Sequence, residues 1–120
     1  MSQKKRFSLT YNEKIHLQKD FIMALRNGRR LENQIIKIIA YKNPSSKKRR
    51  IGLITSRKVA PAVKRNSVKR KLREIFRTNK HSLTDGLDLI FISKSNTTKA
   101  QYEELKSAVL SLLEKAGLYR

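Results

Sequence analysis

Residues 63–77, VKRNSVKRKLREIFR, combine a core-packing pattern with a dense concentration of positive charge. The segment holds seven basic residues and one acidic residue, Glu74, yet four apolar residues recur at helical spacing. On an α-helix, with about 100° between successive residues, the apolar side chains form one stripe, and four cations and an amide share an adjoining arc of about 100°. The stripe consists of Val68, Leu72, Ile75 and Phe76, and the arc of Asn66, Lys69, Arg70, Arg73 and Arg77. Such a helix needs an apolar surface to pack on, so the chain must build a core beneath it.

The arc predicts a rigid surface for phosphate groups. A helix fixed by its apolar stripe holds its cations at constant spacing, and the planar fork of arginine binds phosphate oxygens bidentately. The alternative is a solvated helix face, but such a face usually interleaves acidic residues one turn apart. Here only Glu74 interrupts the basic residues, which favours a binding surface.

The charge of the whole chain points to a polyanionic partner. Its 29 Lys and Arg against 9 Asp and Glu give a net charge of +20 over 120 residues. Residues 42–80 contribute +14 of this charge, whereas residues 81–120 contribute none. A localised excess indicates a binding surface rather than a disordered polycation.

Other classes of protein are disfavoured by what the sequence lacks. There is no cysteine, hence no disulfide framework and no thiolate metal site. No apolar run reaches the roughly 20 residues of a membrane span, so we expect no membrane partner. The basic start lacks the apolar stretch of a signal peptide, and we expect a cytoplasmic protein.

The pattern of apolar residues predicts a small α+β domain. The turn residues Asn43 and Pro44 separate two strands that should pair as a hairpin, and Gly28 suits the left-handed position after a helix. Helices on one face of a small sheet follow from this order of elements. Helices are expected over residues 18–27, 61–78 and about 102–117, strands over 33–42, 50–58 and 86–94, a loose basic arm over 1–9 and a single domain over 10–120.

The strand at residues 33–42, NQIIKIIAYK, has two unlike faces. Because strand side chains alternate, one set should face the core and the other an open surface. The core set is Ile36, Ile38 and Ala40, and the open set is Ile35, Lys37, Ile39 and Tyr41. The open set mixes aliphatic, basic and aromatic side chains.

The segment KRNSVKRKLREIF resembles the signature of the bacterial ribonuclease P protein subunit. The signature begins with Arg-Asn-Arg, continues with Lys-Arg and has a further Arg one turn later. The matching residues are Arg65, Asn66, Lys69, Arg70 and Arg73, whereas Ser67 stands where the family usually has a second Arg. The segment DFIMALRNGR is similar to the family's first helix, and RIGLITSRK to the strand before the signature helix.

The resemblance implies a fold and a function. The implied fold is a four-stranded α+β sandwich with the order helix, three strands, helix, strand, helix and a left-handed crossover; residues 29–32 would supply the fourth strand. The implied function is that of the accessory protein of a ribozyme that removes the 5′ leader from precursor tRNA. The RNA subunit would carry the catalysis and bind the magnesium, and the protein would hold no cofactor. Its partners would be the catalytic ribonuclease P RNA and the leader of precursor tRNA.

The resemblance also implies two sets of site residues. The leader would bind in a cleft between the first helix and the open sheet face, where Leu25 and Ile39 stand at positions that are commonly aromatic in the family. The alternative for Phe21 is a core position, because it lies on the helical stripe with Leu17 and Leu25. The RNA-binding set is Arg65, Asn66, Lys69, Arg70, Arg73, Arg77, Arg57 and Lys58, and the leader-cleft set is Phe21, Lys37, Ile39 and Tyr41.

Catalysis by the protein alone is not expected. Phosphodiester hydrolysis by side chains needs paired carboxylates for metal ions or suitably placed histidines. Asp85 and Asp88 fall at a turn and a strand start, where Asp is ordinary, and His16 and His81 lack partner spacing.

Two other functions remain open from the residues alone. A ribosomal or other structured-RNA-binding protein without enzymatic role would show the same charge. A double-stranded DNA reader would need a helix free to enter the major groove, but a strand stands where its helix-turn-helix partner belongs.

Overall fold

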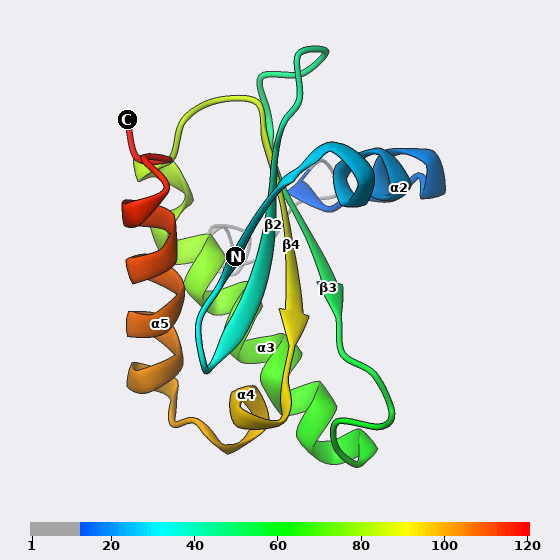
Figure 1. Ribbon diagram of the computed structural model, residues 1–120, viewed down its shortest axis with the longest axis vertical. Helices are drawn as coiled ribbons and strands as arrows, with labels where there is room; N and C mark the ends of the chain where they lie inside the picture. Colours follow the sequence, from blue (N-terminus) through cyan, green and yellow to red (C-terminus); the bar gives the residue numbers. More distant parts are fainter. Residues whose placement is uncertain (1–12) are drawn as a thin grey trace, which may run out of the picture.

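The computed structural model describes residues 13–120, and the arm expected at residues 1–9 lies outside this part of the chain. Its helices and strands follow the predicted order (Figure 1). A short strand is present at residues 29–32, where the resemblance implied a fourth strand, and two short helical segments were not predicted. The elements are α2 (Gln18–Asn27), β1 (Arg29–Glu32), β2 (Ile36–Lys42), β3 (Arg49–Ile54), α3 (Ala62–Asn79), the 3-10 turn η2 (Lys80–Ser82), β4 (Leu87–Ser93), α4 (Ser95–Lys99) and α5 (Tyr102–Lys115).

The four strands form one mixed sheet in the order β1-β2-β4-β3. β1 and β2 pair antiparallel as a hairpin, β2 pairs antiparallel with β4, and β4 pairs parallel with β3. The predicted hairpin between β2 and β3 is therefore wrong, because β4 lies between them. Every β4 residue except Ile92 is buried, and a strand that is apolar on both faces belongs in the middle of a sheet.

The main core lies between one face of the sheet and the helices α3 and α5. Ile36, Ile38 and Ala40 face this core, as the alternation in β2 predicts. The stripe of α3 is buried against it, with Val68, Leu72, Ile75 and Phe76 at most 2% exposed. The small α+β domain with a four-stranded sheet is thus confirmed.

A second, smaller core covers the opposite face of the sheet. Ala24 of α2 packs there on Ile39 and Ile90. The expectation that the helices share one face holds for α3 and α5 and fails for α2, which crosses the other face (Figure 1). Two adjacent isoleucines on that face need an apolar cover, and α2 provides it.

Gly28 allows α2 to approach the sheet closely. A Cβ atom at this position would overlap the Ile39 side chain and the Ala24 carbonyl. Gly28 follows the last residue of α2, as predicted, but its φ of −74° is not left-handed, so the predicted conformation is wrong and close packing is the reason for glycine. No helix in residues 13–120 has both the length and the apolar character needed to cross a membrane.

Candidate nucleic-acid interface

α3 presents the predicted arc of polar and basic side chains beside its buried stripe. Asn66, Arg70 and Arg73 are exposed, whereas Lys69 and Arg77 are half-buried. Arg77 donates from both Nε and Nη2 to the carboxylate of Glu74, the single acidic residue of the helix, which offsets part of the Arg77 charge. The geometry therefore leaves the strongest outward charge on the part of α3 that precedes Glu74.

Arg65 lies at the start of the arc and is half-buried. Its Nε is buried and has no hydrogen-bond partner among the described residues, so packing rather than an ion pair holds this part of the guanidinium. Arg57 and Lys58 are exposed in the turn between β3 and α3. The Ser56 hydroxyl accepts the backbone N–H of Lys58 at 3.1 Å, which tightens that turn. These cations extend the basic surface toward the N-terminal end of α3.

The face of the sheet that carries α2 is best described by rows of neighbouring residues across the strands. In the middle row, Ile39 pairs with Ile90, which pairs with Gly52. The next row on one side contains Lys37, Ile92 and Ile54, and on the other side Tyr41, Asp88 and Arg50. α2 lies over the middle row, because Ala24 packs on Ile39 and Ile90.

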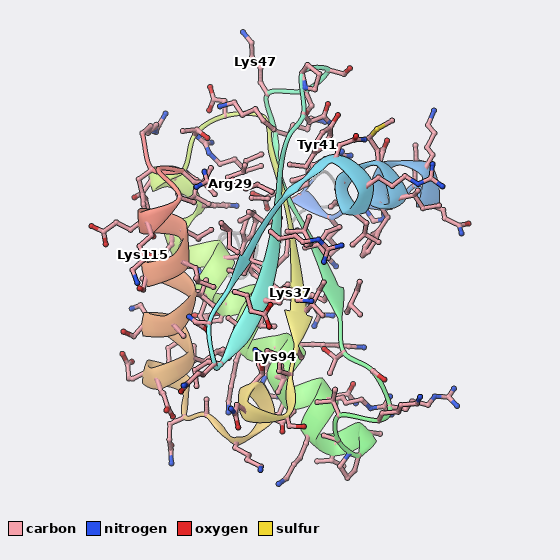
Figure 2. The ribbon with its side chains drawn as sticks, in the orientation of Figure 1. Arg29, Lys37, Tyr41, Lys47, Lys94 and Lys115 are labelled. Atoms are coloured by element: carbon pink, nitrogen blue, oxygen red, sulfur yellow. The ribbon has the colours of Figure 1, made fainter. Side chains whose placement is uncertain are left out.

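α2 separates the predicted leader-cleft residues. Ile39 is 0% exposed, so its placement on an open surface is wrong; the physical reason is the cover that α2 supplies. Lys37 and Tyr41 lie on either side of α2 (Figure 2). Phe21 is half-buried with its ring over Gly52, where a Cβ atom would lie only 2.6 Å from Phe21 Cε2.

The row with Lys37 forms a half-open surface that the sequence only partly indicates. Lys37, Ile54 and Ile92 are all half-buried, and we call them the open row. At the β1 end of this row the Lys94 ammonium lies 2.8 Å from the Glu32 carboxylate. The hydrogen bond from Lys94 lowers the pKa of Glu32, with the charge of Lys94 as a further cause. Ile54 and Ile92 were missed because an uninterrupted apolar strand does not reveal which of its residues a helix leaves uncovered.

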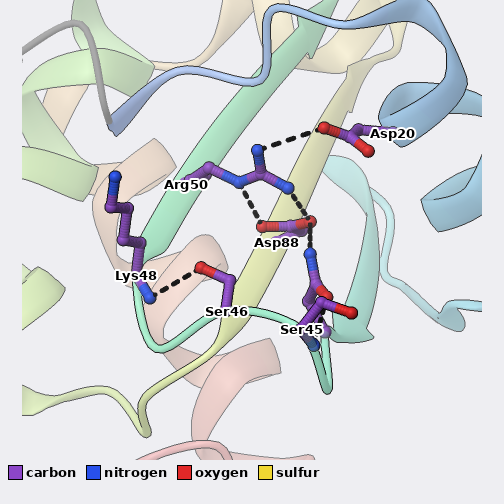
Figure 3. A network of polar contacts seen from close by, with 7 residues as sticks. Asp20, Ser45, Ser46, Lys48, Arg50 and Asp88 are labelled. Carbon is purple, nitrogen blue, oxygen red and sulfur yellow. Dashed lines mark hydrogen bonds and ion pairs between the residues drawn. The ribbon is translucent and has the colours of Figure 1, made fainter.

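On the Tyr41 side of α2 a cavity of about 260 Å³ opens between the helix and the β2–β3 loop. Its lining residues are Lys19, Asp20, Met23, Tyr41, Asn43, Ser45 and Asp88. Asp88 is 1% exposed and accepts hydrogen bonds from Arg50 Nε and Nη2 at 2.9 and 2.7 Å (Figure 3). This hydrogen bonding, together with the charge of Asp88, raises the pKa of Arg50.

The two acidic residues that we considered as catalytic candidates are both engaged in ion pairs. Asp85 lies 2.7 Å from Arg49, and Asp88 lies 2.7 Å from Arg50. Within residues 13–120, no three His, Asp or Glu side chains are grouped so that they could hold a metal ion. These ion pairs fit the structural role that we expected for Asp85 and Asp88.

The fold and these surfaces define a class of protein. It is a small basic α+β domain that carries cations on a helix anchored to its core, with a half-open sheet face on the opposite side. Rigid cation spacing and an extended, partly apolar strip are features of proteins that bind structured and single-stranded RNA.

Comparison with known proteins identifies the family. The sequence model of the family described as Ribonuclease P matches residues 9–117, so the chain belongs to this family. The ribonuclease P protein component of Clostridium botulinum strain Loch Maree is 35% identical over 107 residues, covering 88% of this chain and 96% of that protein. The protein component of Finegoldia magna is 37% identical over 99 residues, covering 82% and 86% of the two chains. The structure of the ribonuclease P protein from Thermotoga maritima superimposes with a TM-score of 0.75 at 29% identity, covering 86% and 96%.

Proposed function

We propose that this chain is the protein subunit of ribonuclease P and that it works in the cytoplasm. It binds the catalytic RNA and the 5′ leader of precursor tRNA, and the RNA performs the hydrolysis. The observation that carries this proposal is the anchored arc on α3, which lies on the opposite face of the sheet from the open row. One molecule can therefore contact two RNA segments at once.

We assign the catalytic RNA to the α3 arc. Asn66, Arg70 and Arg73 are exposed on a helix whose stripe is fully buried, so their spacing is fixed before binding. The helix backbone needs no ordering on binding, and the planar fork of arginine limits the rotamer entropy lost per hydrogen bond. The fixed spacing of these residues along the helix can therefore select RNA by the arrangement of its phosphates. The turn with Arg57 and Lys58 adds charge at the same end of the helix.

We assign the leader to the open row. Ile54 and Ile92 offer apolar contact area to unstacked bases of the leader. Lys37 offers a cation to the phosphates that link those bases. Phe21 stands at the edge of α2 with part of its ring exposed, where it can stack on a base. Ile39 is buried beside this surface under α2 and does not contact the leader directly. Tyr41 would contact the leader only if the RNA passes around α2.

The chemistry belongs to the RNA subunit in this proposal. Asp85 and Asp88 are held by Arg49 and Arg50, so neither is placed to activate a water molecule. Magnesium is expected to bind through the RNA, whose phosphates are the oxygen ligands that it prefers. The protein contributes charge neutralisation, which lowers the magnesium concentration that the RNA needs.

Reconstitution with a bacterial ribonuclease P RNA tests the proposal. At low magnesium, adding the protein should accelerate leader removal from precursor tRNA, and the protein without RNA should cleave nothing. Cleavage by RNA-free protein that is lost on changing Asp85 or Asp88 to Asn would contradict it. Sedimentation of the cellular protein with ribosomes instead of with a structured RNA of several hundred nucleotides would favour a ribosomal role.

A further inference from the structure

A single guanidinium group joins three elements on the α2 face of the sheet. Arg50 of β3 donates two hydrogen bonds to Asp88 of β4, at 2.9 and 2.7 Å (Figure 3). Its third nitrogen, Nη1, lies 3.3 Å from Asp20 Oδ2 in the first turn of α2. Asn43, at the start of the β2–β3 loop, donates a further hydrogen bond to Asp88 at 3.3 Å.

The position of Arg50 is fixed by the sheet. Asp88 is 1% exposed, and a buried carboxylate that loses its partner is strongly unfavourable. Arg50 therefore stays bound to Asp88, and its remaining Nη1 is a fixed donor facing α2. Asp20 carries a negative charge in the first turn of α2, where the helix dipole favours it.

The two ends of α2 are held to the sheet in different ways. At the C-terminal end, Gly28 and Ala24 pack tightly on Ile39, and β1 follows directly. At the N-terminal end, Leu17 is 56% exposed and so does not anchor the helix. Just before the helix, the Ile15 backbone N–H donates to the Ile51 carbonyl of β3 at 3.0 Å, and Ile15 packs on the second core. Within the first turns of α2, the Phe21 ring lies over Gly52 and Asp20 pairs with Arg50.

We propose that Asp20 and Arg50 are positioning residues for leader binding, because together they set where the N-terminal end of α2 lies on the sheet. Phe21 follows Asp20 directly, so the ion pair places the Phe21 ring relative to the open row. This role rests on the proposed contact between the leader and that row. Without the ion pair, the first turn of α2 is held only through the Ile15 segment and the Phe21 ring, so it moves more freely on the sheet and the Phe21 ring loses its fixed distance from Lys37.

The test compares Asp20→Asn with Asp85→Asn. The second substitution removes the ion pair of the neighbouring Arg49, which lies 2.7 Å from Asp85, so it is a matched control. Alternation along β3 places Arg49 on the α3 face, away from α2. Asp20→Asn should weaken holoenzyme binding of long-leader precursor about two- to fivefold, the range of a partly exposed ion pair, and leave mature tRNA unchanged. Asp85→Asn should change neither, and Asp20→Glu should restore the affinity.

A distance measurement reports the position of α2 without any RNA. The chain has no cysteine, so a spin-label pair at Lys19→Cys and Lys42→Cys reports one distance between α2 and β2. Asp20→Asn should broaden the distribution of that distance, and Asp85→Asn should leave it narrow. An unchanged distribution in Asp20→Asn, or equal affinity losses in the two Asn variants, would overturn the positioning role. A wild-type protein that does not distinguish long-leader from mature tRNA would instead overturn the proposed leader contact itself.

Discussion

Two glycines with positive φ differ in what surrounds them. Gly86 has φ +69° and Gly117 has φ +71°, a left-handed conformation that disfavours any side chain. A Cβ atom on Gly86 would lie 2.5 Å from the backbone oxygen of Ser46, whereas one on Gly117 would have nothing within 4 Å. At the scale of single residues, Gly86 therefore serves both conformation and packing, and Gly117 conformation alone.

This difference predicts unequal losses of stability. Gly117→Ala should lower the free energy of unfolding by about 1–2 kcal/mol, the cost of the left-handed conformation. Gly86→Ala should lower it further, because the β2–β3 loop must also move away from the new methyl group. Urea unfolding of both variants measures the two losses. Equal losses would show that displacing the loop at Ser46 costs no measurable free energy.

At the scale of elements, α3 links burial to charge. Its stripe residues are at most 2% exposed, so the helix cannot rotate to present a different face. The backbone positions of its basic residues are consequently held at constant spacing. Glu74 moderates the charge only at the C-terminal end, through Arg77.

Removing the arc should therefore flatten the salt dependence of binding to the catalytic RNA. We expect each substitution among Lys69→Ala, Arg70→Ala and Arg73→Ala to reduce the slope of log affinity against log salt by about 0.7–0.9 per lost phosphate contact. The matched control changes three lysines outside α3, Lys99, Lys106 and Lys115, to Ala and should leave the slope unaltered. If the arc variants have the same slope as the wild type, these cations are solvated and do not contact the RNA phosphates.

At the scale of the whole molecule, the sheet separates two binding surfaces. α3 packs on one face and α2 on the other, so a substitution in the open row leaves the arc untouched. Leader binding and binding of the catalytic RNA should therefore be separable by mutation.

Phe21→Ala combined with Lys37→Ala tests this separation. The double variant loses a stacking ring and a cation, so long-leader precursor should bind about tenfold or more weakly, given about 1–3 kcal/mol for a stacked base. Mature tRNA and the catalytic RNA should bind as to the wild type. Affinities of the reconstituted enzyme for precursors with leaders of graded length measure the effect, and Tyr41→Ala, on the other side of α2, is the comparison variant. Equal losses for every substrate would indicate a folding defect and contradict the leader assignment.

The sequence by itself determined the features that depend on local spacing. Helical periodicity was sufficient to identify the stripe and the arc of α3, because both follow from residues within five turns of one helix. Alternation was sufficient to direct Ile36 and Ile38 into the main core. The signature around Arg65 and Arg73 was sufficient to indicate the family.

Only the tertiary structure decided which strands are neighbours and which side chains α2 covers. Local patterns do not encode strand order, so β2 and β3 resembled a hairpin until β4 was found between them. Alternation placed Ile39 and Tyr41 on one face correctly, but it could not show that α2 crosses that face, buries Ile39 and separates Lys37 from Tyr41. The physical reason is that covering a sheet face depends on contacts between segments far apart in the chain, and the pairing of Arg50 with Asp20 and Asp88 is of the same kind.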